Sequence, residues 1–158
     1  MKLSIFRALG TLLLILSVFS VSAEELTVTD PWVRTAPPNA SALAAFMTLE
    51  NRSGSDISVV DVRTSLAVRR VEFHRTIMAD GMMKMHPKKL IPVPAHSSTE
   101  LKPGSWHIML IDPKKAPTEG EVVHLILVLS NGSEQIVTAS VRQGKMMMEN
   151  HSNKQKID

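Results

Sequence analysis

Residues 122–141, VVHLILVLSNGSEQIVTASV, hold the clearest fold signal in the chain. Two apolar-alternating runs, residues 122–129 and 134–141, stand on either side of Asn131-Gly132. Alternation with a period of two is typical of a β-strand with one buried face, and Asn-Gly between two such runs is a strong hairpin signal. The stretch therefore predicts two strands joined by a tight turn.

The same pattern extends toward the N-terminus. Further strands are predicted at residues 26–34, 43–50, 57–63, 69–75, 82–86, 97–102 and 106–111. Turn residues separate these runs, including Ala79-Asp80-Gly81, Pro103-Gly104 and the proline-bounded stretch 92–94. Many short strands without helical periodicity predict an all-β fold, an antiparallel sandwich or barrel in a single domain.

The first 23 residues differ from the rest of the chain. Lys2 and Arg7 precede the apolar run LGTLLLILSVFSV, and small residues end the segment at Ala23. This is the pattern of a secretory signal peptide, and an uncleaved membrane anchor is disfavoured because the run is short for a bilayer. We therefore expect a signal peptide over residues 1–23, export to the periplasm, and no stable membrane insertion after cleavage. The folded domain is expected over residues 24–142, and the polar residues 143–158 are expected to form a flexible tail.

Composition excludes several functions. The predicted signal peptide holds two of the 18 basic residues and none of the 15 acidic ones, which leaves 16 basic against 15 acidic residues in the mature chain. With no dense basic run and few aromatic residues, nucleic-acid binding has no support. The chain has no cysteine, so thiol nucleophiles, thiolate metal ligands and lipid attachment through cysteine are absent. No nucleophile elbow, phosphate loop or HExxH motif is present, and we expect a protein that is not an enzyme.

Histidine and methionine residues fall on unexpected faces of the predicted strands. In residues 104–110, GSWHIML, Trp106 and Ile108 share an apolar face, whereas His107 and Met109 share the opposite one. His74, in RRVEFHR, likewise lies opposite its strand's apolar face. The segment DGMMKMHPKK then adds Met82, Met83 and Met85 among lysines. Methionine is ordinarily flexible core filler, but this grouping also suits a soft metal site.

Imidazole and thioether groups without thiolates suit Cu(I). Thioethers are soft ligands, whereas zinc usually takes Cys, His and carboxylate ligands. A blue-copper electron-transfer site needs a cysteine thiolate and is therefore excluded. The residues thus indicate a two-His, two-Met site suited to holding copper and passing it on.

The spacing of these residues resembles the signature of the periplasmic copper chaperones called PCu(A)C. His74, ten residues, Met85, twenty-one residues and His107-Ile108-Met109 reproduce H-x10-M-x21-H-x-M. The resemblance covers about residues 26–142 and implies a cupredoxin-like Greek-key β-barrel or sandwich with a solvent-near Cu(I) site. It implies His74, Met85, His107 and Met109 as ligands. The implied role is copper delivery to subunit II of cytochrome c oxidase, directly or with a Sco-type copper protein.

Family members often carry a Met/His-rich C-terminal extension that can take a second copper. Met146, Met147, Met148 and His151 resemble a short version, so a second copper, Cu(II), is a further expectation for the tail. A disordered, solvated end is the competing interpretation.

Other histidines and methionines have simpler interpretations. His86 and His96 are expected at the surface, His124 as a half-buried strand residue, and Met47 as core filler. Met78, Met82 and Met83 are either exposed loop residues or a landing strip for incoming copper.

Two other functions stay open from sequence. One is periplasmic copper sequestration or resistance without a dedicated recipient. The other is an adhesive or structural β-sandwich on which the exposed Met and His residues are incidental.

Overall fold

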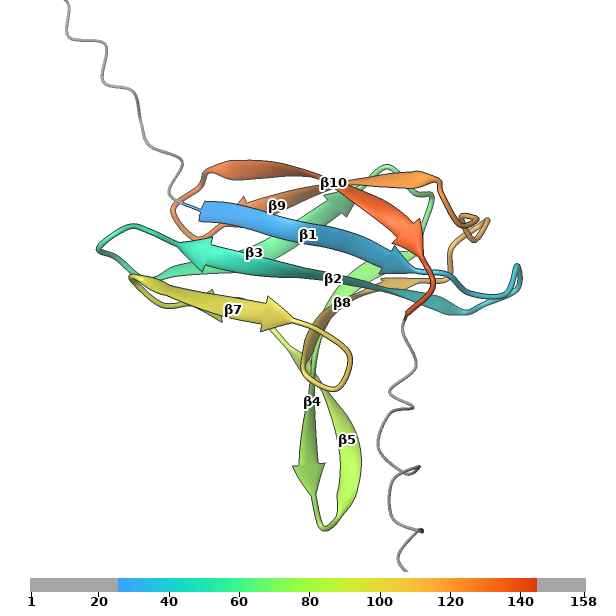
Figure 1. The fold of residues 1–158 in the computed structure, drawn as a ribbon, viewed down its shortest axis with the longest axis horizontal. Helices are drawn as coiled ribbons and strands as arrows, with labels where there is room; N and C mark the ends of the chain where they lie inside the picture. The colour runs from blue at the N-terminus through green and yellow to red at the C-terminus, as the bar shows by residue number, and fades with distance from the viewer. Residues whose placement is uncertain (1–25, 145–158) are drawn as a thin grey trace, which may run out of the picture.

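The computed structural model describes residues 26–144, and these form an all-β domain (Figure 1). The predicted signal peptide and the tail from residue 145 onward lie outside the described residues. The strands are β1 (Leu26–Arg34), β2 (Ala42–Asn51), β3 (Ile57–Thr64), β4 (Arg70–Ala79), β5 (Met82–Lys88), β6 (Ile91–Val93), β7 (Ser97–Leu101), β8 (Trp106–Ile111), β9 (Val122–Leu129) and β10 (Glu134–Arg142). No helix long and apolar enough to cross a membrane occurs in this part of the chain.

The β9–β10 hairpin forms as the sequence predicts. Its loop is closed by hydrogen bonds from Gly132 N to Leu129 O (2.9 Å) and from Leu129 N to Ser133 O (2.9 Å), and Gly132 has φ +85°. This is a three-residue hairpin loop that needs a left-handed residue at its last position, which glycine supplies. The buried residues of both strands alternate with exposed ones, so one face of the hairpin belongs to the core. His124 lies on the other face and is exposed, which corrects its expected half-burial.

All ten strands described join one sheet in the order β5-β4-β8-β7-β2-β1-β10-β9-β3-β6. The sheet curls on itself: β6, at one end of this order, contacts β7 and β2, which lie in the middle of the order. The inward-facing aliphatic side chains thereby enclose a single core, with Leu49, Val59, Ile108 and Leu127 among its fully buried members. The predicted all-β fold class is confirmed.

Two features of the sheet differ from the sequence-based expectation. β1 pairs with β10 in parallel, Trp32 beside Ser140, so the sheet is mixed rather than wholly antiparallel. The predicted turn at residues 92–94 overlaps the short strand β6, residues 91–93, which pairs with β3 and has Ile91 and Val93 buried. Pro92 is tolerated there because β6 is an edge strand, hydrogen-bonded to β3 but to no second strand among those described.

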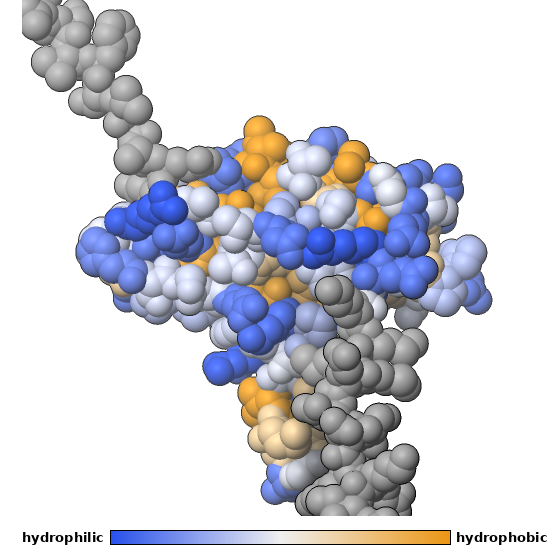
Figure 2. All heavy atoms as spheres, viewed as in Figure 1, coloured by the Kyte–Doolittle hydropathy of each residue, from blue (hydrophilic) through white to orange (hydrophobic). Residues whose placement is uncertain are grey.

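The hairpin of β4 and β5 projects from the body of the domain as an arm (Figure 1). Its turn is Asp80-Gly81, in which both residues have positive φ (54° and 72°), as the primed turns of two-residue hairpins require. Both strands run longer than predicted, and every residue of β5 is exposed. Several of the exposed side chains on the arm are hydrophobic, as Figure 2 shows. Its base adjoins β8, and the candidate site lies there.

Candidate metal centre

The strand register places all four predicted ligands on one face of the β8–β4–β5 segment. His74 on β4 is directly opposite His107 on β8, and Met109 is opposite Glu72. On the other side of β4, Met85 is opposite Thr76. Since opposed residues share a face and alternate residues along a strand do too, His74 stands at the centre of the group, with Met85 and Met109 diagonal to it.

The two histidine rings lie close together. Their centroids are 5.7 Å apart with an interplanar angle of 42°. Residues 33 positions apart in sequence therefore meet through the β4–β8 pairing. This places two imidazoles where one ion could contact both.

The free nitrogen of His74 is Nδ1. Its Nε2 lies 2.9 Å from Glu72 Oε2, and hydrogen bonds from Arg70 and His74 lower the pKa of the Glu72 carboxyl, so Glu72 is an acceptor at neutral pH. His74 Nε2 must then carry the proton and donate, so Nδ1 is the unprotonated nitrogen with a free lone pair. Nδ1 is buried and has no hydrogen-bond partner among the described residues.

His107 is fixed in the opposite tautomer. Its Nδ1 lies 3.0 Å from the carbonyl of Ser105, which can only accept, so Nδ1 donates and Nε2 carries the lone pair. His107 Nε2 is likewise buried and without a partner in the described chain. The Ser105 carbonyl also accepts from Thr76 N (3.1 Å), which ties the β8 entry to β4. Burial lowers the pKa of His107, the Ser105 hydrogen bond opposes that shift, and the positive charges of protonated His74 and of Arg34 add to it.

Burial within the site is uneven. His107 is only 4% exposed, so the interpretation of its strand face as a polar, solvent-near face is corrected: this end of the group is enclosed. Met85 is 52% exposed, and Met109 and His74 are half-buried. The group is therefore closed at His107 and open at Met85.

An aromatic wall encloses the His107 side. The Phe46 ring lies 6.3 Å from the His107 ring, and Trp32 lies 4.6 Å from Phe46. The Arg34 guanidinium stands over both aromatic rings, 5.4 Å from Phe46 and 5.9 Å from Trp32. This arrangement keeps water from one side of His107 and places a cation nearby.

Sequence reasoning missed the residues that orient the histidines. Glu72 could have been found, because it shares a strand face with His74 two residues away. The Ser105 carbonyl and the wall of Phe46 and Arg34 carry no sequence signal, since a main-chain acceptor has no residue preference and the wall depends on packing.

Met78, Met82 and Met83, expected as exposed loop residues or as a landing strip for copper, are exposed residues of the strands that form the arm. His86 and His96 are exposed as predicted, and Met47 is in the core as predicted. The tail residues Met146, Met147, Met148 and His151 lie outside the described residues. Within residues 26–144 no group of three or more His, Cys, Asp or Glu side chains is placed to hold a metal ion.

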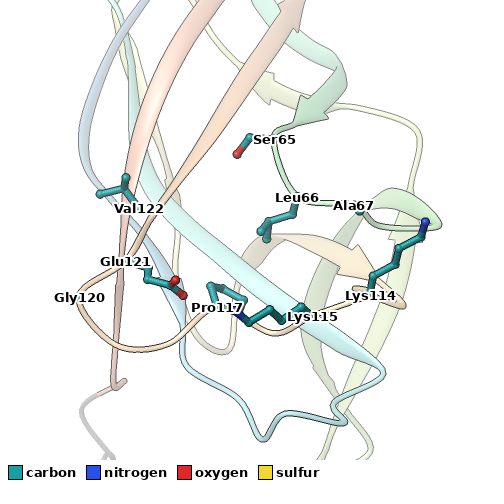
Figure 3. Close-up of a pocket in the computed structure, with 9 residues that line it drawn as sticks. All are labelled: Ser65, Leu66, Ala67, Lys114, Lys115, Pro117, Gly120, Glu121 and Val122. Carbon is teal, nitrogen blue, oxygen red and sulfur yellow. The ribbon is translucent and has the colours of Figure 1, made fainter.

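A separate pocket of about 530 Å³ is formed by the loop between β3 and β4, the loop between β8 and β9, and the first residue of β9 (Figure 3). It is lined by Ser65, Leu66, Ala67, Lys114, Lys115, Pro117, Gly120, Glu121 and Val122. None of the four predicted ligands lines it. The candidate metal centre is therefore a group of side chains on one face of the sheet, outside this cavity.

A family model described as "Putative lipoprotein LpqE-like" matches residues 26–141. The chain belongs to the LpqE-like family. One relative, "Putative lipoprotein Lxx21020" of Leifsonia xyli subsp. xyli (strain CTCB07), is 31% identical over 130 residues, which cover 82% of this chain and 76% of that protein.

Solved structures with this LpqE-like fold include copper-binding domains. "Copper-bound PCuAC domain from PmoF2" matches with a TM-score of 0.64 and 22% identity, over 76% of this chain and 94% of that domain. "Solution structure of CuI-DR1885 from Deinococcus Radiodurans" matches with a TM-score of 0.57 and 29% identity, over 79% of this chain and 85% of that one. The predicted resemblance to PCuAC proteins is confirmed.

Proposed function

We propose that this protein is a copper chaperone that binds Cu(I) through His74 Nδ1, His107 Nε2 and the thioether sulfurs of Met85 and Met109. The observation that carries the proposal is that His74 Nδ1 and His107 Nε2, on rings 5.7 Å apart, are both buried and without a hydrogen-bond partner among the described residues. A buried acceptor left without a partner costs about 1–3 kcal/mol, and a bound ion would remove that cost at both rings.

The donor set favours Cu(I). Two neutral imidazoles and two thioethers add no negative charge, and thioethers prefer soft ions. Glu72 and the Ser105 carbonyl each hold the non-ligating nitrogen of one ring, which is the usual outer-shell arrangement of metal-binding histidines. These partners keep the ligating nitrogen of each ring deprotonated and aimed at the shared face.

The uneven exposure suits transfer rather than permanent storage. His107 is enclosed and fixes one side of the site, whereas Met85 is exposed on a projecting arm. A recipient's ligand can approach from the Met85 side and replace the thioethers one at a time. Copper-bound structures of this fold support the metal assignment.

We further propose that the protein acts in the periplasm and delivers copper to subunit II of cytochrome c oxidase or to a Sco-type partner, as the PCuAC resemblance implies. The lipoprotein description of the LpqE-like family supports export. Lipid attachment through cysteine does not apply to these 158 residues, because they contain no cysteine.

Stoichiometric transfer tests the proposal. Purified apo-protein is incubated with Cu(I), bound metal is counted, and the loaded protein is mixed with an apo oxidase copper domain. We expect one Cu(I) in the folded domain, its loss in a His74→Ala/His107→Ala variant, and movement of copper to the oxidase domain.

Two results would overturn parts of the proposal. Tight Cu(I) binding without transfer to any oxidase or Sco-type domain favours a sequestration protein. Full Cu(I) binding by the double histidine variant means that the site lies elsewhere.

A further inference from the structure

A second pair of thioethers lies on the arm, on the same face as the proposed copper site. Met78 on β4 is directly opposite Met83 on β5. Alternation along β4 puts Met78 on the face of His74, and alternation along β5 puts Met83 on the face of Met85. Directly opposed side chains have Cβ atoms about 4.5–5.5 Å apart, so both sulfurs can turn onto one ion.

Both methionines are largely exposed, Met78 at 68% and Met83 at 61%. As core filler they would have to be buried, so packing does not explain them. Met82, at 59% exposed, is on the opposite face of the same arm, opposite Ala79. It therefore provides a matched internal control.

Met83 also connects the arm to the site. Its terminal methyl lies against Gly104, where an added Cβ would come within 3.0 Å of it. Gly104 precedes Ser105, whose carbonyl holds His107. The Met83 side chain thus extends from the arm toward the base of the site and occupies space that is free because residue 104 is glycine.

We propose that Met78 and Met83 form a weaker, exposed Cu(I) site that captures copper and passes it through Met85 to the histidines. This inference rests on the proposed function of the main site. Met83 and Met85 are two residues apart on one strand, roughly 7 Å, a distance that flexible methionine side chains can bridge.

Transfer along the arm is a ligand exchange. One Cu–S bond to Met83 or Met78 breaks as a bond to Met85 forms, and the ion remains Cu(I), so no oxidant or reductant is needed. Two thioethers hold the ion less strongly than two imidazoles with two thioethers, and the affinity therefore rises toward His107.

The first experiment measures loading rates. The wild-type protein, the double variant Met78→Leu/Met83→Leu and the control Met82→Leu are each mixed with a Cu(I)–bicinchoninate complex in a stopped-flow instrument. Leucine keeps most of the volume and hydrophobicity, so a role in docking a protein would survive the change while a ligand role would not. We expect loading of the double variant to slow about tenfold, equivalent to ~1.4 kcal/mol in the barrier, with unchanged final Cu(I) affinity and no effect of Met82→Leu. Equal loading rates for all three proteins would overturn the proposal.

The second experiment separates this pair from the main site. The full chain carrying His74→Ala/His107→Ala is labelled with 13C at the methionine methyls and titrated with Ag(I), a redox-stable stand-in for Cu(I). We expect saturable shifts of the Met78 and Met83 methyls and none of Met82. Absence of those shifts overturns the pair as a site, whatever the wild-type main site does. Their presence supports the pair even if copper delivery by the protein is disproved.

Discussion

Replacement of Glu72 by alanine tests whether the proposed site depends on the tautomer of His74. Glu72 Oε2 accepts from His74 Nε2 at 2.9 Å, and the lowered pKa of Glu72 keeps it charged at neutral pH. Without this acceptor the His74 proton can move to Nδ1, the nitrogen assigned to copper. Loss of such outer-shell partners typically costs 10–100-fold in metal affinity, which corresponds to about 1.4–2.7 kcal/mol.

The expected loss of Cu(I) affinity in Glu72→Ala can be distinguished from a loss of protein stability. Glu72 also pairs with Arg70, and because exposed ion pairs contribute little, its removal should leave the stability of the apo-protein nearly unchanged. Cu(I) affinity is measured by competition with a chromophoric chelator, and the tautomer of His74 is observed by 15N NMR. Glu72→Gln is the matched control, because its amide oxygen still accepts a hydrogen bond, and it should retain most of the affinity.

The reasoning fails if Glu72→Ala binds Cu(I) as tightly as the wild-type protein. It also fails if Glu72→Gln and Glu72→Ala lose affinity equally, because charge rather than hydrogen bonding would then be responsible. Unchanged 15N shifts of His74 in the alanine variant would show that Glu72 does not set the tautomer.

Four further outcomes are expected. Met109→Leu should cost the apo-protein less than about 1.5 kcal/mol while Cu(I) affinity falls, and unchanged affinity would remove Met109 from the site. Ile108→Ala should do the reverse, since Ile108 is fully buried: denaturant titration should show a loss of about 2–5 kcal/mol, and a loss below 1 kcal/mol would contradict its place in the core. Because the pKa of His107 is below its ordinary value of 6.5, the unfolded chain binds a proton first as pH falls. The stability of the apo-protein should therefore decrease as pH falls below about 6.5 and should not change above it, and His107→Gln should reduce this dependence. Denaturant titrations between about pH 5 and pH 8 test the prediction. An unchanged dependence of stability on pH in His107→Gln would show that His107 is not responsible. Truncation after Arg142 should leave the fold and one Cu(I) site intact by circular dichroism and metal counting, whereas loss of all copper binding would place the site in the tail.

Sequence by itself determined most of the strands and the residue types of the candidate site. Alternation of apolar residues is local, so it located β1, β8 and β9 within the observed bounds and assigned His107 and Met109 to the same face. The choice of Cu(I) likewise needed only residue types, because imidazoles and thioethers without cysteine leave few metals that fit.

Only the tertiary structure decided how those residues meet. The pairing of β4 with β8 places His74 opposite His107, and register between strands distant in sequence depends on long-range hydrogen bonds that no local pattern encodes. The same pairing accompanies the burial of His107 and the contacts of Glu72 and the Ser105 carbonyl with the rings. Within residues 26–144, one nitrogen of each imidazole then has no hydrogen-bond partner. The parallel β1–β10 contact and the short strand β6 were hidden for the same reason: each is stabilised by a neighbour that lies far along the chain.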